Sequence, residues 1–331
     1  MLRDTGPALT RRISLDTIRD AAEHVYKAAV RTPLVRLELP SDVRRPETFL
    51  KLETLQPIGS FKIRGAQNAV CRLPREELAH GVWTVSAGNA AQGVALAARL
   101  ASAPCSVMVM DTAPETKLKA IERLGATIVK APYDECWQTV EQHRSERMRG
   151  RFVHPFDDDD FISGNGTMGL EILEDLPDVD AIVAPLGGGG LLAGIACAVD
   201  TLRPATRIYA AEPETAAPLS VSLRRDAASR FDGWQASFVD GAGGKSVLDT
   251  MWPLLRQWVD DSIVVTLDDA ARAMRVVADR VHVISEGAAA CAVAAALSPY
   301  IADAGHKKVV AVVSGGNIDL ARFAQLVGAC V

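Results

Sequence analysis

The chain has 331 residues, with 36 Lys and Arg against 41 Asp and Glu, and 48% of its residues are hydrophobic. This composition excludes a disordered or collagen-like chain and allows one large domain or two of ordinary size. The net charge of −5, without a concentrated basic patch, argues against a nucleic-acid partner. No run approaches the roughly 20 apolar residues of a membrane span, and the first residues lack the apolar core of a signal peptide. We therefore expect no membrane association and a cytoplasmic protein.

The cysteines are dispersed, with no CxxC pair and no cluster with histidine, at Cys71, Cys105, Cys136, Cys197, Cys291 and Cys330. This spacing argues against a disulfide framework and against a zinc site. We expect reduced and mostly buried thiols.

Short apolar runs alternate with longer Ala-rich helical patterns. In chain order, the runs predict strands at 48–52, 82–86, 106–110, 127–130, 181–186, 207–212, 262–266 and 308–314. The patterns between them predict helices at 15–29, 61–71, 89–100, 115–124, 133–149, 164–174, 191–202, 267–281 and 288–297. Such alternation is typical of an α/β fold with a largely parallel sheet. Residues 213–247 break the periodicity and predict a loop-rich connection, whereas 82–130 form a self-contained set typical of an inserted small domain.

A run of four glycines follows one predicted strand and precedes a helix: Gly187, Gly188, Gly189 and Gly190. Glycines at such a turn let backbone N–H groups converge on an anion at a helix N-terminus, where the helix dipole favours negative charge. The run therefore predicts a phosphate cradle. The turn also fits the dinucleotide fingerprint G-x-G-x-x-A, and Glu212 ends the next strand about 20 residues later, where a ribose-binding acid would lie. This segment alone leaves both interpretations open.

Lys62 lies near the predicted start of a helix, within GSFKIRGA at 59–66. A cation there is unfavourable because the helix N-terminus carries partial positive charge. Nearby positive charge also lowers the pKa of a lysine, which favours the neutral amine needed to attack an aldehyde. The alternative is an ordinary solvated lysine, and this segment alone does not decide between the two.

Two further strand ends carry polar groups. Ser86, Ala87, Gly88 and Asn89 lead from a strand into a helix, where free N–H groups would suit a carboxylate, although a simple helix cap is the alternative. Ser314 ends the last predicted strand, at the start of SGGN. Because open α/β sheets place ligands at the carboxyl ends of their strands, these segments predict one crevice with phosphate, amine, carboxylate and hydroxyl chemistry.

Taken in order, these motifs resemble the serine/threonine dehydratase and serine racemase family of fold-type II pyridoxal-phosphate enzymes. The motifs are LKLE at 50–53, GSFKIRGA at 59–66, SAGN at 86–89, GGGG at 187–190 and SGGN at 314–317. The resemblance extends from about residue 13 to 320 and includes TPL at 32–34, APETK at 113–117, HPFDD at 154–158 and GTMGLE at 166–171. So many ordered matches make the dinucleotide interpretation improbable.

The resemblance implies a tryptophan synthase β-like fold with two open, twisted, mostly parallel sheets flanked by helices. Its large cofactor domain would span 1–70 and 152–331, and a small inserted domain, 71–151, would carry the carboxylate turn. Lys62 would form an imine with pyridoxal 5'-phosphate, against whose ring Phe61 would pack. The other cofactor contacts would be Asn89 at the phenolic oxygen, Ser314 at the pyridine nitrogen, and Gly187, Gly188, Gly189 and Gly190 at the phosphate. The substrate carboxylate would meet Ser86, Ala87, Gly88 and Asn89.

The implied activity is that of an ammonia-lyase, a dehydratase that converts a 3-hydroxy amino acid of the L-threonine or L-serine type into a 2-oxo acid and ammonia. The resemblance also implies that the protein forms a homodimer. Its other expected partner is the small amino-acid substrate. Three alternatives remain. One is a catabolic relative acting on phenylserine or a hydroxyectoine-derived compound, and another is an amino-acid racemase. The third, from a different class, is a non-catalytic phosphate- or dinucleotide-binding protein, which would leave Lys62 unexplained.

Three positions depart from the family pattern. Ala87 stands where serine racemases place a hydroxyl, which favours elimination over racemisation. Ala90 replaces a frequent histidine and predicts a roomier pocket. Trp137 stands where some relatives have arginine, which would disfavour an acidic substrate side chain and allow a bulky apolar one; the alternative is that Trp137 is simply core.

The divalent cation of part of the family is doubtful in this chain. Glu212 and a carbonyl near Ala216 match the start of the site, but Pro218 stands where a second acid is needed, and only Glu214 could compensate. The alternative for Glu212 is a surface acid at a strand end. Because the sequence ends at Val331, we also expect no regulatory domain of the biosynthetic type.

Overall fold

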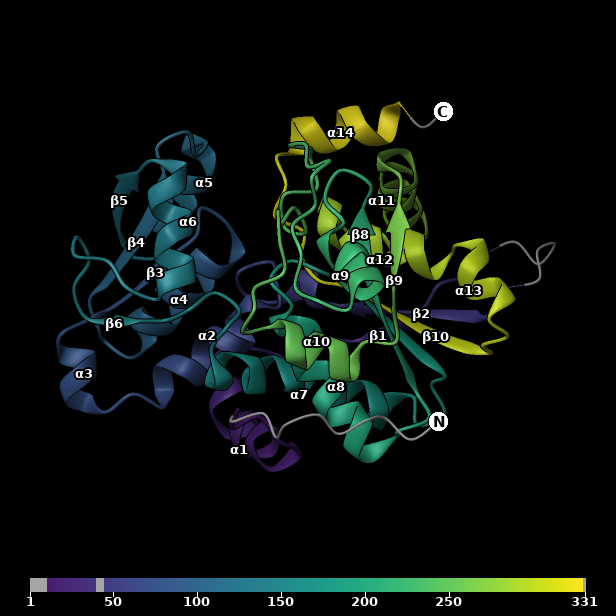
Figure 1. Cartoon of the computed structure of the whole chain (residues 1–331), viewed down its shortest axis with the longest axis horizontal. Helices are drawn as coiled ribbons and strands as arrows, with labels where there is room; N and C mark the ends of the chain where they lie inside the picture. The colour runs from purple at the N-terminus through teal and green to yellow at the C-terminus, as the bar shows by residue number, and fades with distance from the viewer. Residues whose placement is uncertain (1–10, 40–44, 330–331) are drawn as a thin grey trace.

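The computed structural model of the chain describes residues 11–39 and 45–329. It is an α/β fold with two sheets flanked by helices (Figure 1). The larger sheet has the order β1-β2-β10-β7-β8-β9, formed by Leu34–Arg36, Glu47–Leu52, Lys308–Val313, Ala181–Pro185, Arg207–Pro213 and Asp261–Val265. The smaller sheet has the order β5-β4-β3-β6, formed by Thr127–Ala131, Cys105–Met110, Val82–Val85 and Arg151–Phe152. Within these sheets β1 pairs antiparallel with β2, and the other pairings are parallel.

Helices cover the faces of both sheets. Those up to α7 are α1 (Leu15–Val25), η1 (Glu53–Leu55, a 3-10 turn), α2 (Lys62–Cys71), α3 (Arg75–Ala79), α4 (Asn89–Leu100), α5 (Glu115–Glu122), α6 (Tyr133–Gln142) and α7 (Asp159–Asp175). Those that follow are α8 (Gly190–Leu202), α9 (Pro218–Arg225), α10 (Trp252–Trp258), α11 (Leu267–Val281), α12 (Gly287–Ala296), α13 (Pro299–Asp303) and α14 (Leu320–Gly328). In Figure 1, α3 to α6 surround the smaller sheet, apart from the larger sheet and its helices.

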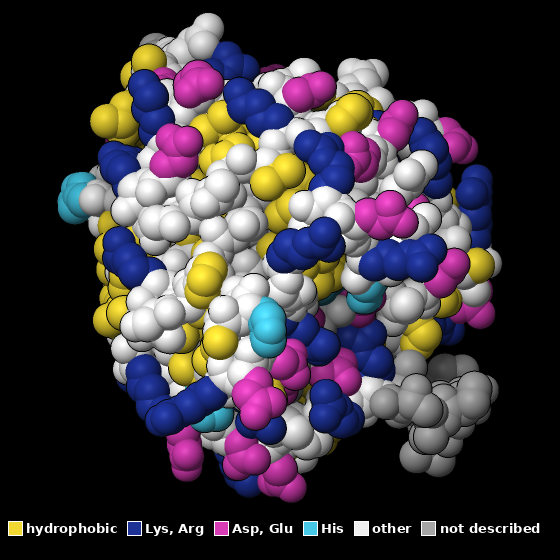
Figure 2. Space-filling model, turned by 90° about the vertical axis from the view of Figure 1, so that its left-hand side faces the viewer, with side chains coloured by type: hydrophobic (Ala, Val, Ile, Leu, Met, Phe, Trp, Pro, Cys, Tyr) yellow, Lys and Arg dark blue, Asp and Glu magenta, His cyan; other side chains and the backbone are white. Residues whose placement is uncertain are grey.

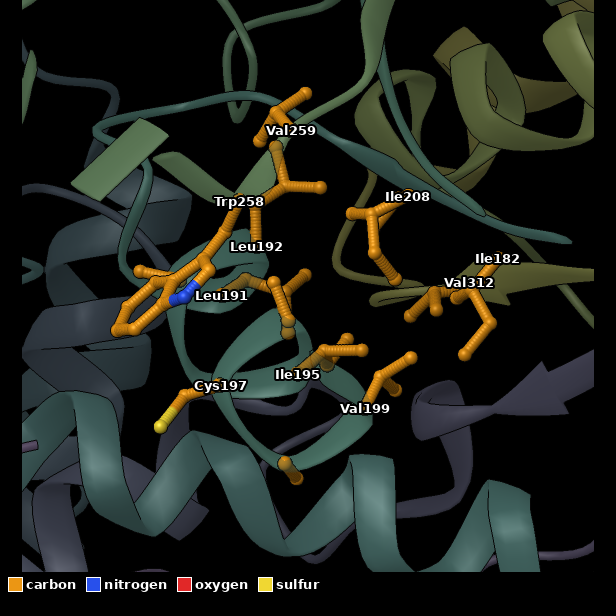
Figure 3. Packing of buried hydrophobic residues seen from close by; sticks show 14 of the residues in the cluster. Ile182, Leu191, Leu192, Ile195, Cys197, Val199, Ile208, Trp258, Val259 and Val312 are labelled. Carbon is orange, nitrogen blue, oxygen red and sulfur yellow. The ribbon is translucent and has the colours of Figure 1, made fainter. Parts of the chain in front are cut away.

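Helix α8 is fixed in the main hydrophobic core (Figure 3). Its apolar side chains meet β7, β8 and β10 on one side and α10 on another, through residues that include Leu192, Ile195, Ile182, Val312 and Trp258. Burial of such side chains stabilises a fold by roughly 1.5–3 kcal/mol each. The glycine turn that precedes α8 is therefore held by a rigid helix.

Helix α2, which begins at Lys62, lies unusually close to α7. A Cβ at Gly65 would lie 2.2 Å from the ring of Phe161, and a Cβ at Gly164 would lie 2.5 Å from the carbonyl oxygen of Arg64. Glycine is therefore required on both helices, and this close packing fixes the position of Lys62.

Each of the eight predicted strands is present within one residue at either end. The sequence did not predict β1 and β6, whose lengths of three and two residues are too short to show alternation. The helix predicted at 133–149 ends at Gln142 because His143 adopts a left-handed conformation (φ 55°). The helix predicted at 164–174 begins earlier, because Asp158 caps the N–H of Phe161. The loop predicted at 213–247 is interrupted by α9.

The described cysteines are free thiols, and all but Cys71 are buried; Cys330 lies outside the described residues. No helix in the described part of the chain is long and apolar enough to cross a bilayer. On the face shown in Figure 2, Lys and Arg side chains are intermixed with Asp and Glu. The absence of a nucleic-acid partner stays a prediction.

Candidate active site

A cavity of about 420 Å³ collects the predicted site segments. It lies where β3, β7 and β10 end and where α2 begins. The predicted residues that line it are Phe61, Lys62, Ser86, Ala87, Gly88, Asn89, Gly187, Gly188, Gly189, Gly190 and Ser314. Four segments separated by up to 250 residues of sequence therefore meet in one crevice at the carboxyl ends of strands.

Lys62 is the first residue of α2, and its Nζ donates a hydrogen bond of 2.6 Å to the carbonyl oxygen of Pro155. Burial lowers the pKa of Lys62 to about 8, although the carboxylate of Glu286 opposes this effect. The sequence predicted the direction of this shift, but the main cause is burial and not the helix dipole. An amine with such a pKa is partly neutral near pH 7–8 and can act as a nucleophile or a base.

The glycine turn presents backbone, not side chains, to the cavity. Gly189 is the N-cap of α8, with φ of +94° and no side-chain cap, so the first N–H groups of the helix lack that partner. A Cβ at Gly188 would lie 2.1 Å from the ring of Phe156, and one at Gly190 would lie 2.4 Å from the Phe156 carbonyl oxygen. Only glycine fits this turn, whose N–H groups and helix N-terminus suit a phosphate.

The turn at residues 86–89 follows β3 and leads into α4. Gly88 is the N-cap of α4 and has no side-chain cap, and a Cβ built on it meets nothing within 4 Å. Ser86 accepts a hydrogen bond of 3.1 Å from the N–H of Gly88. The turn thus faces open space with helix N–H groups available, which suits a carboxylate.

Comparison with known proteins identifies the family. Residues 25–315 match the family described as "Pyridoxal-phosphate dependent enzyme". The chain belongs to this family. Its two-sheet α/β architecture is that of fold-type II pyridoxal-phosphate enzymes, as predicted. The glycine turn, the lysine of lowered pKa and the cavity fit the phosphate and aldehyde of that cofactor.

The chain is similar to several named proteins. It is 38% identical to an L-threonine ammonia-lyase of Thermotoga maritima over 310 residues, which cover 93% of this chain and 76% of the relative. It is 36% identical to the catabolic L-threonine dehydratase TdcB of Staphylococcus aureus (strain USA300) over 322 residues, which cover 95% and 92%. The solved structure of maize serine racemase has a TM-score of 0.87 and 32% identity, covering 95% of this chain and 96% of that one.

The sequence motifs around Lys62 also build a buried ionic network on the far side of α2. The guanidinium of Arg64 donates to Glu53 (2.8 Å) and to Glu171 (2.7 Å). Lys51 pairs with Glu171 at 2.6 Å, and the hydroxyl of Tyr26 donates to the same carboxylate. We call Lys51, Glu53, Arg64 and Glu171 the buried ionic network. The sequence analysis quoted all four residues as motif letters without predicting this role.

The HPFDD segment supports Lys62 and the glycine turn. His154 Nδ1 accepts the N–H of Asp157 at 2.7 Å, and its Nε2 lies 3.2 Å from the carbonyl oxygen of Val140. Both ring nitrogens are therefore used to fix the turn that presents the Pro155 carbonyl to Lys62. Phe156 of the same turn packs against the glycines.

A second cavity of about 450 Å³ brings His143, His154 and Asp157 within 4.8 Å of one another. Burial opposes ionisation of Asp157, but its contacts with His143, Thr250 (2.6 Å) and Arg11 (2.7 Å) outweigh burial and lower its pKa. Since His154 also has both nitrogens engaged, this cluster fits a structural network and not an open metal site.

The doubtful cation site at Glu212 and Ala216 does not assemble. The Glu212 carboxylate accepts from the N–H groups of Leu219 and Ser220, each at 2.8 Å, and from the Ser262 hydroxyl at 2.5 Å. By accepting the two N–H groups, the carboxylate caps the start of α9, and burial raises the pKa of Glu212 to about 7. Pro218 supplies no ligand. The residues therefore do not fit a divalent cation, and no metal-ligand group within the described residues includes Glu212.

Three further interpretations of this region are also wrong. Glu212 is fully buried and is not a surface acid. It also lies outside the cavity lining, where a ribose-binding acid would have to be. Glu214 does not compensate, because its carboxylate accepts the N–H of Leu267.

The cavity wall contributed by the smaller sheet and α6 is largely apolar, with Val85, Met108, Met110, Tyr133, Cys136, Trp137 and Val140. Trp137 is half-buried and lines the cavity, and its indole N–H donates to Glu141 at 2.7 Å. It is therefore not simply core. Ala87 and Ala90 also line the cavity and add no polar group.

Sequence reasoning missed several lining residues. Lys117 of α5 forms an ion pair with Asp240, and both line the cavity. Lys245 lies 4.2 Å from the ring centroid of Tyr133 and 4.3 Å from that of Trp234. These contacts connect the smaller-sheet helices to the irregular part of 213–247. Lys117 belongs to the quoted APETK motif, but nothing in the sequence signals its partner Asp240, because the loop-rich segment shows no periodicity.

Glu286, which precedes the Ala-rich helix α12, was also missed. Its Oε1 accepts a hydrogen bond of 2.8 Å from the Asn89 amide. Burial raises the pKa of Glu286 to about 7, and the bond from Asn89 opposes that shift. Its only sequence signal is an acid at the start of a buried helix, which is too common to single out.

Proposed function

We propose that the chain is a pyridoxal-phosphate-dependent ammonia-lyase that dehydrates and deaminates a 3-hydroxy amino acid, with L-threonine as the first candidate substrate. Its similarity to enzymes named L-threonine ammonia-lyase and L-threonine dehydratase over more than 90% of the chain supports this activity. The single observation that carries the proposal is Lys62, a half-buried amine of lowered pKa in the cavity that also contains the glycine turn.

We propose that Lys62 holds the cofactor through its aldehyde and that the ring lies against Phe61. Gly187, Gly188, Gly189 and Gly190 would hold the phosphate through N–H groups. Ser314, which is buried at the end of β10, would face the pyridine nitrogen. A hydroxyl there does not enforce protonation of the ring, which favours β-elimination over transamination.

When bound, pyridoxal phosphate supplies an electron sink that makes the Cα proton of an amino acid acidic. The N–H groups at residues 86–89 would bind the substrate carboxylate and orient Cα. Lys62, neutral in part at pH 8, would take the Cα proton. The 3-hydroxyl would then leave as water by gaining one proton, which balances the proton that Lys62 removed from Cα, and hydrolysis of the enamine product would give the 2-oxo acid and ammonia.

The apolar wall indicates the kind of substrate side chain. A carboxylate placed against Met108, Met110 and Trp137 would lose hydration without a partner, which is costly. We therefore propose that a methyl or a larger apolar group is accepted and that an acidic one, as in hydroxyaspartate, is rejected. Phenylserine and a hydroxyectoine-derived amino acid remain alternative substrates.

Racemisation is the second candidate activity, because maize serine racemase has a very similar fold. A racemase of two bases needs a group on the face of the substrate opposite the lysine, and Ala87 offers none there. We propose that racemase activity is minor.

The test is release of 2-oxo acid and ammonia from L-serine, L-threonine and its 3-epimer, phenylserine and hydroxyaspartate, with pyridoxal phosphate added. We expect turnover of L-threonine, and also of L-serine, and none of hydroxyaspartate. Chelation with EDTA should leave the rate unchanged, because Glu212 is surrounded by hydrogen-bond donors. Chiral analysis of recovered serine measures racemisation in the same reactions.

Two results would contradict the proposal. One is a protein that takes up no pyridoxal phosphate, and the other is cofactor fixed by borohydride at a lysine other than Lys62. If phenylserine alone is turned over, the proposed substrate changes from L-threonine to phenylserine, and the proposed reaction stays the same.

Three further expectations from the resemblance belong to the same proposal. They are a homodimer, a cytoplasmic location, and a division into a domain of 1–70 and 152–331 and a domain of 71–151. The separation of β3 to β6 into their own sheet supports that division. Sedimentation equilibrium and limited proteolysis test the first and the last.

A further inference from the structure

Three polar side chains from distant segments form a chain of hydrogen bonds along the cavity. Asn317, which follows β10, donates from Nδ2 to the Oδ1 of Asn89 at 2.8 Å. Asn89, at the start of α4, donates from its own Nδ2 to the Oε1 of Glu286 at 2.8 Å. All three residues line the cavity. We call Glu286, Asn89 and Asn317 the amide relay.

The relay fixes which end of each amide is the donor. Asn317 Nδ2 also donates to the carbonyl oxygen of Ile58 at 2.7 Å, so both of its hydrogens are used. Asn89 must therefore offer its oxygen to Asn317 and its nitrogen to Glu286. A primary amide nitrogen carries two hydrogens, so Asn89 keeps one N–H that neither relay partner takes.

The carboxyl group of Glu286 is held in place by its surroundings. It is only 5% exposed, and its backbone N–H donates to the Gly315 carbonyl oxygen at 2.9 Å. A Cβ at Gly315 would lie 2.9 Å from Oε1 of Glu286, and one at Gly241 would lie 3.4 Å from it. Glycines on both sides thus let the carboxyl group approach the backbone, where it has little freedom to turn.

We propose that Glu286 and Asn317 are positioning residues that hold the Asn89 amide so that its remaining N–H is a fixed donor to the phenolic oxygen of bound pyridoxal phosphate. This inference rests on the proposed function. A carboxyl oxygen accepts a hydrogen bond whether or not the group is protonated, so the positioning holds across the pH range near neutrality. A flipped Asn89 would instead present its oxygen to the phenolic oxygen, which repels it.

The test compares Glu286→Ala, Glu286→Gln and Asn317→Ala with the wild-type protein. The measurements are the dissociation constant of pyridoxal phosphate and the absorption spectrum of the bound cofactor. Glutamine keeps an oxygen that can accept the Asn89 N–H, so Glu286→Gln is the matched control for charge.

We expect Glu286→Ala and Asn317→Ala to weaken cofactor binding roughly tenfold to hundredfold, which is the loss of one hydrogen bond to a charged oxygen. Their bound cofactor should also absorb less in the visible band and more in the near ultraviolet, because an unsupported phenolic oxygen holds its proton more strongly. Glu286→Gln should stay within roughly threefold of the wild type and keep the visible band.

Wild-type affinity and spectrum in both alanine variants would overturn the inference. Equal losses in Glu286→Gln and Glu286→Ala would also overturn it, because charge and not orientation would then matter. Should Glu286→Ala fail to fold, Asn317→Ala and Glu286→Gln still decide. A wild-type protein that binds no pyridoxal phosphate would contradict the proposed function instead, so the two failures are distinguishable.

Discussion

Lys62 and Arg64 lie two residues apart in α2, but Lys62 is half-buried at the cavity whereas Arg64 is fully buried, and their polar partners differ. Arg64 is fully buried and donates to Glu53 and Glu171, which raises its pKa and keeps it charged. The Lys62 amine donates to one carbonyl oxygen, that of Pro155, and burial lowers its pKa to about 8.

This difference shows how one helix supports both structure and chemistry. A buried cation with two carboxylate partners stays ionised and stabilises the packing around it, whereas one bonded only to a neutral acceptor can lose its proton. The buried ionic network therefore belongs to the fold, and Lys62 to the reaction.

Removing the Arg64 cation is the strongest way to break this comparison. Arg64→Met leaves Glu53 and Glu171 buried with less compensation, and we expect the free energy of unfolding to fall by about 3–5 kcal/mol. Urea denaturation measures it. Arg275→Met, which removes an exposed pair with Asp279, is the control and should change stability by less than about 1 kcal/mol. Equal effects would mean that the network does not stabilise the fold.

The cavity that contains Lys62 depends on the glycine turn at 187–190, where no larger residue fits. Gly188→Ala forces a Cβ into the ring of Phe156 and should cost about 3 kcal/mol, with weaker binding of pyridoxal phosphate. Gly328→Ala, whose Cβ meets nothing within 4 Å, should have little effect. Thermal unfolding and cofactor titration measure both variants; a stable Gly188→Ala that binds cofactor normally would contradict the tight turn.

Replacing Lys62 should stabilise the cofactor-free protein. Between about pH 8 and 10.5 the unfolded chain holds a proton on Lys62 that the folded chain has lost, so this group makes stability rise with pH across that window. Lys62→Met should therefore be more stable than the wild type by about 3 kcal/mol at pH 7, and the gain should vanish above pH 10.5. Lys307→Met, at an exposed position, should show no such dependence. A gain that does not vary with pH would indicate packing and not charge.

The smallest expected effect lies at the cavity rim. Asp240 is 56% exposed and its partner Lys117 is 36% exposed, so Asp240→Asn should lower the free energy of unfolding by less than about 1 kcal/mol, and less in high salt. A larger loss in urea denaturation would show that this ion pair stabilises the fold as the buried network does.

Local patterns in the sequence predicted the strands and the four site segments, because alternation, glycine runs and strand-end polar residues are local signals. The position of Lys62 at a helix start gave a lowered pKa as one of two interpretations, and the structure shows the lowered pKa with burial as its main cause. The ion pair between Arg64 and Glu171 could not be predicted in this way. The two residues lie 107 positions apart in the sequence, and only the packing of α2 on α7 brings them together.

The remaining errors have the same cause. Glu212 was assigned to a doubtful cation site, but it caps α9, a helix that begins within a segment predicted to be a loop. Glu286 reaches Asn89 across 197 residues, and no periodicity signals a contact of that range.

The most direct test of the account is the pH dependence of the rate at which cofactor-free protein captures pyridoxal phosphate covalently. The rate should rise with a midpoint near pH 8, because the neutral Lys62 amine is the nucleophile, and Lys62→Met should show no capture at this site. A midpoint near pH 10.5, the ordinary pKa of a lysine, would contradict the claim that burial without a carboxylate partner makes Lys62 reactive.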